Sequence, residues 1–359
     1  MLWPLARRRH VAPDQAQRLA DVRQKNPESE TWLALVEAAL AESQDAATWD
    51  AALPAPVDHR PARAPLLDGA VVGVHRRSAS RFVRELARLA GLDGAAHRLD
   101  ALDLLEAAIR QDDARIDALA TGDPSTLRVV AQVAAVPLLR ACARTIGKDV
   151  SAAWWEGYCP LCGAWPTLAE FRGLERKRWL RCGRCGMGWE VPWLRCPFCA
   201  ETSHENLGYL APEDGETTRK VEVCDTCKGY VKAEPTVSEL PWWGVLLDDV
   251  ATVALDVAAL DRGYHRPERR GFDLEVKVVD AIGLAIKRDL LDRAVAADPD
   301  PDAFEAWLLE QCAAAGPAEG GMRAMALSIF EEWRLALAAG SFGDWLAQGA
   351  PSDDASRET

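Results

Sequence analysis

The chain has 359 residues, of which 49% are hydrophobic, and it carries a formal net charge of −13. A chain of this length can bury a large core and suggests two or three domains. The acidic balance disfavours binding of nucleic acid or of a membrane surface by the whole protein, and no apolar run approaches membrane-spanning length.

The first 150 residues predict a helical bundle, because apolar positions recur at helical spacing in several stretches. The expected helices cover residues 13–25, 28–47, 78–92 with Ser80 as a cap, and 99–119. The sequence Asp123-Pro124-Ser125 then opens a strongly apolar helix, on which Cys142 is expected to be a buried core thiol. The Pro-rich stretch over residues 53–67 predicts a linker or long loop.

Helical patterning stops near Trp154, and the segment that follows is rich in Gly, Trp and strand-favouring residues, as small metal-binding ribbons are. Helix is expected again over residues 244–260. Three further amphipathic stretches predict helices over residues 276–297, 302–314 and 319–347. The last nine residues, 351–359, are expected to be frayed and solvated.

Eight of the ten cysteines form four Cys-x-x-Cys pairs within 69 residues. The pairs are Cys159/Cys162, Cys182/Cys185, Cys196/Cys199 and Cys224/Cys227. Four thiolates make one tetrahedral metal site, so these eight predict two sites. Nineteen residues separate the first two pairs and 24 separate the last two, enough for a β-hairpin in each case. Sequential pairing needs only such local hairpins, but an interleaved cross-brace arrangement stays open.

Two other uses of cysteine fit the sequence less well. A disulfide framework needs an oxidising compartment. Residues 1–13 are followed by polar residues and lack the apolar core of a signal peptide, so we expect a cytoplasmic protein. Redox Cys-x-x-Cys chemistry usually employs one pair at the start of a helix, where the helix dipole lowers a thiol pKa. Four pairs among Gly, Trp and Arg do not resemble that arrangement.

The residues after each pair predict a regular first site and a less regular second site. A residue able to adopt positive φ often follows the second cysteine, and glycine does so at least cost. Gly163 and Gly186 follow the first two pairs, whereas Ala200 and Lys228 follow the last two. Zinc and iron both accept four thiolates, so the ligand type leaves the metal open. A complete tetrathiolate site favours a structural or electron-storage role over hydrolysis.

Aromatic and basic residues surround the cysteine pairs. Eight of the fourteen tryptophans lie between residues 154 and 243, and seven cations lie between residues 171 and 195 against two acidic residues. Such tryptophans can pack over the knuckles of a small ribbon, which are the tight turns that carry each Cys-x-x-Cys pair. Such cations usually form a solvated hairpin face. The alternatives are a surface for a partner protein or for single-stranded nucleic acid. The candidate partner-binding residues are Arg176, Arg178, Trp179 and Trp193.

The residues around the pairs carry more information than the cysteines alone. The relevant stretches are Tyr158-Cys-Pro-Leu-Cys-Gly163, Arg178-Trp-Leu-Arg-Cys-Gly-Arg-Cys-Gly-Met-Gly-Trp189, Arg195-Cys-Pro-Phe-Cys199, Glu222-Val-Cys-Asp-Thr-Cys-Lys-Gly-Tyr-Val-Lys232, Asp248-Asp249-Val-Ala-Thr-Val-Ala-Leu-Asp256 and Arg262-Gly-Tyr-His-Arg-Pro267. In this order they resemble the FdhE family of formate dehydrogenase accessory proteins. The resemblance covers roughly residues 1–270, weakly in the helical N-terminus and specifically from Tyr158 onward.

This resemblance implies a cytoplasmic maturation factor that acts on the catalytic subunit of a molybdenum- or tungsten-dependent formate dehydrogenase. It also implies a helical N-terminal domain and two rubredoxin-like iron sites. By motif, the first site has Cys159, Cys162, Cys182 and Cys185 as ligands, and the second has Cys196, Cys199, Cys224 and Cys227. No formate-oxidising centre is implied, so the chain is not expected to be an enzyme. The family usually ends near residue 270, and this chain continues for about 90 residues more.

We therefore expect an α+β protein in five parts. These are a helical bundle over residues 1–153, rubredoxin- or zinc-ribbon-like subdomains over 154–192 and 193–240, the family's closing helix and tail over 241–270, and a helical extension over 271–359. The expected cofactor is iron at both sites, with zinc as the alternative. The expected partner is a formate dehydrogenase catalytic subunit, with self-association left open. The alternative function is a zinc-ribbon nucleic-acid-binding protein, and a thiol–disulfide oxidoreductase ranks third.

Overall fold

A computed structural model describes residues 11–45, 49, 61–92, 99–212 and 218–281, together with isolated positions from residue 293 to residue 340. The chain divides into two compact units, Met1–Val278 and Val279–Thr359. Most of the second unit is outside the described residues. The predicted helices over 302–314 and 319–347, the frayed end over 351–359 and the role of the extension therefore lie outside this description, except at isolated positions.

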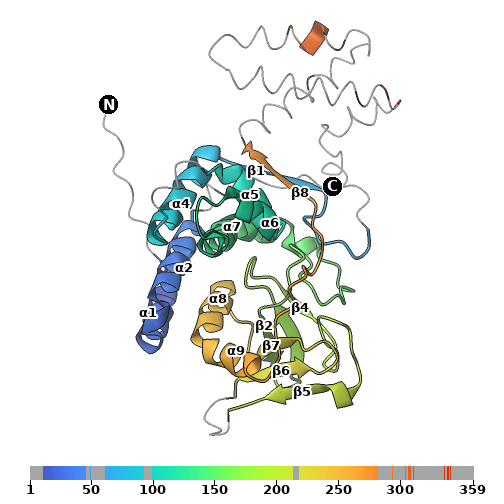
Figure 1. Ribbon diagram of the computed structural model, residues 1–359. Helices are drawn as coiled ribbons and strands as arrows, with labels where there is room; N and C mark the ends of the chain where they lie inside the picture. The colour runs from blue at the N-terminus through green and yellow to red at the C-terminus, as the bar shows by residue number, and fades with distance from the viewer. Residues whose placement is uncertain are drawn as a thin grey trace, which may run out of the picture. The chain divides into compact units, whose positions relative to one another are not determined.

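The long helix α7, which spans Pro124–Ile146, lies at the centre of the N-terminal helices and packs mainly against four of them (Figure 1). Asp123 caps α7 by accepting a hydrogen bond from the backbone N–H of Ser125, as the sequence predicts. Cys142 is buried on α7, which confirms its assignment to the core. The other helices of this layer are α1 (Pro13–Lys25), α2 (Glu30–Glu42), α4 (Arg76–Leu89), α5 (Ala101–Ile109) and α6 (Asp113–Leu119), with the short 3-10 turns η1 (Pro27–Ser29) and η2 (Gly147–Asp149).

Contrary to the expectation that no apolar run approaches membrane-spanning length, length and composition alone would allow α7 and η2, residues Pro124–Asp149, to cross a membrane. However, 67% of the most apolar window of this helix is buried within the fold. The core helix of a globular domain passes the same length test, so this is weak evidence for a membrane span. Apolar side chains of α7 instead meet α2, α4, α5 and α6.

Three predicted helix boundaries were wrong. Ser80 does not cap a helix, because α4 begins at Arg76 and Ser80 lies within it. The helix predicted over 99–119 is broken into α5 and α6, since Gln111 adopts a φ of +55° and Asp112 caps α6. The helix predicted over 28–47 ends at Glu42.

A small two-stranded sheet joins segments that lie far apart in the sequence. Strand β1 (Ala70–Val74) pairs with β8 (Val276–Asp280). The helix predicted over 276–297 is therefore wrong at its start, where Val276 and Val278 are buried and Lys277 between them is exposed. That alternation is the period of a strand, but over five residues it is too short to distinguish from helical spacing. The rest of that prediction lies outside the described residues.

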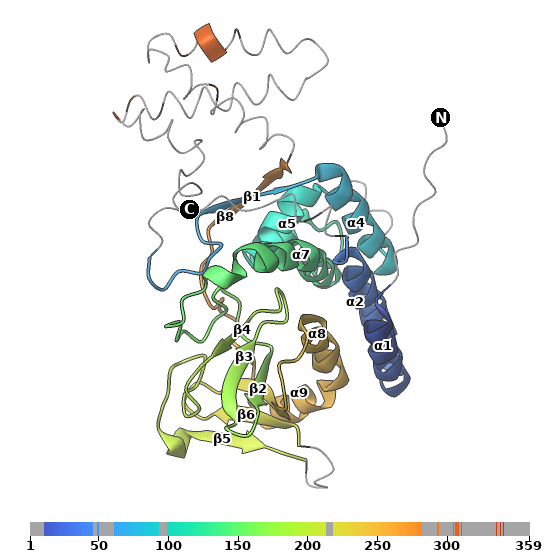
Figure 2. The same cartoon turned by 180° about the vertical axis from the view of Figure 1, so that it is seen from behind.

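Both cysteine-rich hairpins contribute to one six-stranded sheet (Figure 2). The first supplies β2 (Leu168–Arg172), β3 (Lys177–Arg181) and β4 (Gly188–Glu190), which are antiparallel. The second supplies β5 (Leu207–Leu210), β6 (Lys220–Cys224) and β7 (Tyr230–Thr236), also antiparallel, after the short turn η3 (His204–Asn206). The parallel pair β2–β7 joins them, with Leu168 opposite Lys232. The α+β fold with two ribbon-like halves is confirmed, and the halves share a continuous sheet.

Two short helices cover one face of this sheet, which we call the helix face. They are α8 (Trp242–Ala251) and α9 (Val253–Leu260). Lys232 is buried beneath them, and its ammonium lies 2.6 Å from carboxylate oxygens of both Asp249 and Asp256. The single helix predicted over 244–260 is split at Thr252, whose hydroxyl donates to the backbone carbonyl of Asp248. The opposite face of the sheet, which we call the open face, carries Phe171, Lys220 and Val231.

Candidate metal centres

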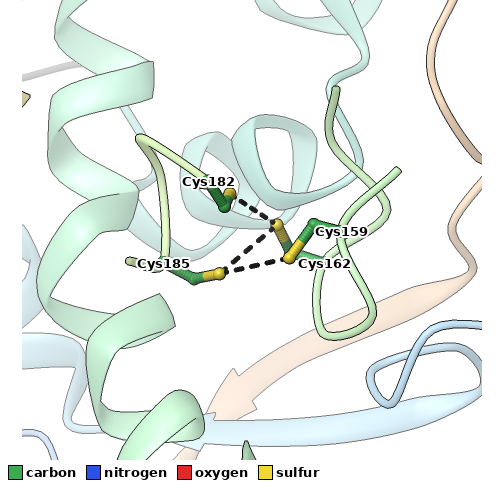
Figure 3. A group of neighbouring side chains, drawn as sticks. All are labelled: Cys159, Cys162, Cys182 and Cys185. Carbon is green, nitrogen blue, oxygen red and sulfur yellow. Dashed lines mark hydrogen bonds between the residues drawn. The ribbon is translucent and has the colours of Figure 1, made fainter. Parts of the chain in front are cut away.

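The first site is formed by two loops whose cysteine sulfurs converge (Figure 3). Its members are Cys159, Cys162, Cys182 and Cys185. The Sγ atoms of Cys159 and Cys185 lie 3.4 Å apart, and Cys162 Sγ lies 3.6 Å from that of Cys182 and 3.8 Å from that of Cys185. All four side chains are buried.

The second site gathers the other two pairs in the same way. Its members are Cys196, Cys199, Cys224 and Cys227. The Sγ atoms of Cys196 and Cys227 lie 3.7 Å apart, as do those of Cys199 and Cys224. Cys199 is exposed and Cys227 partly so, which distinguishes this site from the first.

These distances fit a tetrahedral metal and not a disulfide. Four sulfurs at about 2.3 Å from a zinc or ferric ion stand about 3.8 Å from one another, whereas a disulfide needs about 2.05 Å. The observed separations of 3.4–3.8 Å match the first value. Each site combines neighbouring pairs, so the arrangement is the sequential one and not the interleaved one.

The backbone closes all four knuckles with the same hydrogen bond. The N–H of each leading cysteine donates to the carbonyl five residues later, over 2.8–3.0 Å. The acceptors are Ala164 for Cys159, Met187 for Cys182, Glu201 for Cys196 and Gly229 for Cys224. The residue after each second cysteine has positive φ, namely +69° at Gly163, +74° at Gly186, +63° at Ala200 and +56° at Lys228. The prediction of a less regular second site was wrong for the backbone, because Ala and Lys adopt this conformation here too.

Crowding and burial set the protonation of the first site. Burial raises the pKa of Cys159 well above its usual range. Hydrogen bonds from Cys159, Cys162 and Cys185 hold the pKa of Cys182 well below its usual range. Without added positive charge the cluster therefore favours a thiolate at Cys182 beside a protonated Cys159. A divalent or trivalent cation would compensate the remaining charges, so the donor set suits a metal.

Two arginines connect the helical layer to the first site by hydrogen bonds. Arg184, inside the second knuckle, donates to the backbone carbonyls of Ala108 and Ile109 at the C-terminal end of α5. A cation at this end of a helix also interacts favourably with the helix dipole. Arg140 on α7 donates to the carbonyl of Cys185 over 2.6 Å. Burial lowers the pKa of Arg140 to about 10, so its charge is still present at neutral pH.

The second site is tied together by Glu201, which the cysteine spacing does not reveal. One carboxylate oxygen accepts hydrogen bonds from the backbone N–H groups of Thr202 and Ser203, over 2.8 Å each. The other accepts from the Thr226 hydroxyl over 2.6 Å and from the Asn206 amide over 3.1 Å. Glu201 thus links the third knuckle to the fourth. Its hydrogen bonds, led by that from Thr226, lower its pKa to about 2.

Comparison with known proteins bears directly on the second site. Residues 194–272 match a family model described as FdhE, C-terminal domain. This span contains all four cysteines of the second site and the tail that packs against them. Through this domain the chain is related to the FdhE family.

Curated FdhE proteins align with about a third of the chain. An FdhE homolog from Rhizobium meliloti (strain 1021) is 37% identical over 122 residues, which is 33% of this chain and 38% of that protein. An FdhE homolog from Aquifex aeolicus (strain VF5) is 28% identical over 32% of this chain and 41% of that protein. FdhE from Escherichia coli O127:H6 is 32% identical over 30% of this chain and 35% of that protein. The alignments thus span less than half the length of each relative.

A solved structure is also similar. The crystal structure of the FdhE protein from Pseudomonas aeruginosa covers 74% of this chain and 96% of that chain, with a TM-score of 0.44 and 22% sequence identity.

The tail of the FdhE C-terminal domain closes over the fourth knuckle. The N–H of His265 donates to the carbonyl of Lys228 over 2.8 Å. The hydroxyl of Tyr264 donates to the carboxylate of Asp225 over 3.0 Å. Arg269 donates to the carbonyl of Phe198 in the third knuckle over 2.7 Å. The tail therefore holds both knuckles of the second site.

Most of the cations near the FdhE domain form ion pairs or stacking contacts with other residues of the chain. Arg178 and Arg181 are buried against Glu222 and Glu170. Arg172 pairs with Glu170 and stacks on Trp179, with 4.3 Å from its guanidinium carbon to the ring centre.

The four candidate partner-binding residues therefore occupy different places. Arg178 has only 3% of its side chain exposed and bridges the two hairpins through Glu222. Trp179 lies under Arg172 on the helix face. Arg176 is exposed in the β2–β3 turn with a φ of +49°. Trp193 is exposed beside Phe171 on the open face.

Proposed function

We propose that this chain is a non-enzymatic accessory factor that binds the catalytic subunit of a molybdenum- or tungsten-dependent formate dehydrogenase and assists its assembly. The observation that carries the proposal is the FdhE C-terminal domain over residues 194–272, built around the second tetracysteine site. The curated relatives align over less than half their length, so the activity and partner of the whole protein are part of the proposal.

The metal of both sites is proposed to be iron, with zinc as the alternative. Cys159, Cys162, Cys182 and Cys185 would hold the first ion, and the remaining four paired cysteines the second. When bound, iron would allow a one-electron redox role, whereas zinc would contribute fold stability alone. In either case the protein's contribution is to fix four sulfurs at metal-binding separation by the hydrogen-bonded knuckles.

The non-enzymatic part of the proposal follows from the donor sets. Each site already supplies four thiolates, so a tetrahedral ion has no position open for substrate or water. Structural and electron-storage roles fit such a site better than hydrolysis does. A tetrathiolate metal site needs reduced cysteines, which suits a reducing compartment, and we place the protein in the cytoplasm.

The alternative of a nucleic-acid-binding ribbon has less support. Six of the seven cations between residues 171 and 195 contact carboxylates or backbone carbonyls of the chain: Arg172, Lys177, Arg178, Arg181, Arg184 and Arg195. Phosphate binding depends on cations that are free to replace counterions along a strand. Such a binder would also work against a net charge of −13.

Co-purification with a formate dehydrogenase catalytic subunit tests the proposal. We expect the chain to be retained by the tagged subunit, and formate dehydrogenase activity to fall in cells that lack the chain. A variant with Cys182→Ala and Cys224→Ala together serves as the metal-deficient control and should restore little of that activity. Absence of association, together with undiminished dehydrogenase activity in cells without the chain, would contradict the proposal.

A further inference from the structure

A groove of about 200 Å³ lies on the open face of the sheet beside the second cysteine site. Its lining includes the exposed Trp193, Leu194 and Tyr209 and the partly exposed Lys220. The buried residues Phe198, Val231, Cys196 and Cys224 also line it. We call this the β5 groove. It is smaller than the roughly 300–1,000 Å³ of pockets for small molecules or cofactors, and its size suits one large apolar side chain.

Large apolar side chains at the mouth of the β5 groove are exposed to solvent. Trp193 is 60% exposed, Leu194 58% and Tyr209 66%. Isolated exposed apolar residues are common, but several around one groove indicate a binding surface. Trp and Tyr bury a large area at low conformational cost, which is why they are enriched at binding hot spots.

The groove runs along the free edge of the sheet. Strand β5 is the last strand in the order β4-β3-β2-β7-β6-β5, and Figures 1 and 2 both place it at the outer border of the sheet. Gly208 and Tyr209 on β5 are exposed. An edge strand presents a row of backbone groups on which an extended peptide can add a further strand. The edge would fix the peptide's direction, and the groove would receive one of its side chains.

The charge at the groove mouth is positive. The Lys220 ammonium lies 4.9 Å from the centre of the Phe171 ring and 5.0 Å from that of Tyr209. Among the described residues no carboxylate pairs with Lys220, whereas its neighbour Glu222 is occupied by Arg178. Arg195, which also lines the groove, donates to the backbone carbonyl of Trp155. In a chain with a net charge of −13, a lysine that has no carboxylate partner among the described residues and lies beside the exposed ring of Tyr209 favours an acidic partner.

We propose that the β5 groove binds an extended segment of a partner protein, in which a large apolar residue lies close to an Asp or Glu. The apolar side chain fills the groove, the carboxylate pairs with Lys220 and the backbone adds to β5. The bound segment would cover the Cys196 and Cys224 side of the second site. This proposal does not depend on the partner being a formate dehydrogenase subunit.

A random peptide library displayed on phage tests the proposal on the full, metal-loaded chain. We expect enrichment of peptides with an aromatic or large aliphatic residue within one or two positions of an acidic residue. Lys220→Gln and Tyr209→Ala should each weaken the selected peptides about tenfold, as for a binding hot spot. Lys220→Glu should shift selection toward basic peptides, a change that a purely structural lysine would not cause. Circular dichroism and metal content verify that each variant is folded.

Two exposed apolar residues away from the groove provide matched controls. Leu174 in the β2–β3 turn is fully exposed and Val237 is 95% exposed. Leu174→Ala and Val237→Ala should leave peptide binding unchanged. Loss of binding in Leu174→Ala with no effect of the groove variants would move the surface to the β2–β3 turn and overturn the proposal.

Other outcomes would also overturn it. One is that no acidic apolar peptides are enriched, and another is that wild type and Lys220→Gln bind the selected peptides equally. A third is concentration-dependent self-association that Tyr209→Ala abolishes, because this would assign the groove to a second copy of the chain. A pull-down with the catalytic subunit separates the two proposals. Equal capture of wild type and groove variants leaves the accessory function standing without the groove. Groove-dependent peptide binding without any capture of the subunit leaves the groove standing alone.

Discussion

Four residues with positive φ, one after each Cys-x-x-Cys pair, shape both metal sites. Glycine occupies two of these positions at no steric cost, and Ala200 and Lys228 occupy the others. A non-glycine residue pays about 1–2 kcal/mol for this conformation. At Gly186 the space is also restricted, because an added Cβ would lie 2.5 Å from Trp242 Cβ and 2.8 Å from Arg140 Nη1.

Gly186→Ala should therefore destabilise the protein more than an alanine at a glycine that has open space. Gly173 in the β2–β3 turn is the matched control, since its φ is +64° and no atom lies within 4 Å of an added Cβ. Gly173→Ala should cost about 1–2 kcal/mol for the backbone alone, and Gly186→Ala about 1–3 kcal/mol more for overpacking. Urea unfolding at saturating metal measures both. Equal losses would show that the Trp242 contact is not restrictive.

At the scale of the elements, Arg184 is the contact that fixes the second knuckle to α5. Its guanidinium donates to the carbonyls of Ala108 and Ile109 at the C-terminal end of the helix, where the Ala108 carbonyl also accepts from the backbone N–H of Gln111. Arg184→Met keeps much of the aliphatic length and removes these bonds.

We expect Arg184→Met to lower the free energy of unfolding by about 1.5–3 kcal/mol, as for hydrogen bonds to a charged group. Hydrogen exchange should become faster at the end of α5 and in the second knuckle. Arg176→Met, in the exposed β2–β3 turn, is the control and should change stability by less than about 0.5 kcal/mol. No difference between the two variants would remove Arg184 from the account of how the site is held.

The elements also show why some features could be predicted from sequence and others could not. Knuckles are local, so cysteine spacing predicted two tetracysteine sites, but it left the interleaved pairing open, and the ligand set of each site came from the family resemblance. The α7 helix was predictable because its cap and its apolar pattern are contiguous. Strands β1 and β8 were missed because each is five residues long and its partner lies about 200 residues away. Glu201 was missed for a similar reason, since its partner Thr226 lies 25 residues away in another knuckle.

The parallel pairing of β2 with β7 was missed for the same reason, because the two strands lie far apart in the sequence. Cysteine spacing predicts two separate hairpins, and nothing in either hairpin specifies that Leu168 should face Lys232. The join is stabilised by burial beneath α8 and α9, where Lys232 meets Asp249 and Asp256. These carboxylates come from α8 and α9, a segment that local patterning predicted as one helix and could not orient.

Across the whole molecule, the two sites differ in exposure more than in geometry. The first lies under the helical layer with all four sulfurs buried, whereas the second has Cys199 exposed and Cys227 partly exposed. An exposed ligand can be protonated or captured by a chelator without prior opening of the fold, and a buried ligand needs local unfolding.

Chelation should therefore remove metal in two phases. We expect the second site to lose its ion first. Its rate of metal loss should exceed that of the first site at least about tenfold if opening the first site costs about 1.4 kcal/mol or more. Mixing with excess chelator, followed by absorbance or a chromogenic indicator, resolves the phases. Cys224→Ala, which retains the first site, should show the slow phase alone, and Cys182→Ala the fast phase. A single phase in the wild type would contradict the difference between the sites.

The metal content of the purified chain tests the central claim most directly. Mass spectrometry of the metals should give two ions per wild-type chain, one in Cys182→Ala and one in Cys224→Ala, and none in the double variant. A red colour in aerobically purified protein would identify ferric tetrathiolate sites. A colourless protein with two zinc ions would identify the alternative, two zinc sites. Fewer than two ions in the folded wild type, or two ions in a folded Cys182→Ala variant, would contradict the account of two tetracysteine metal sites.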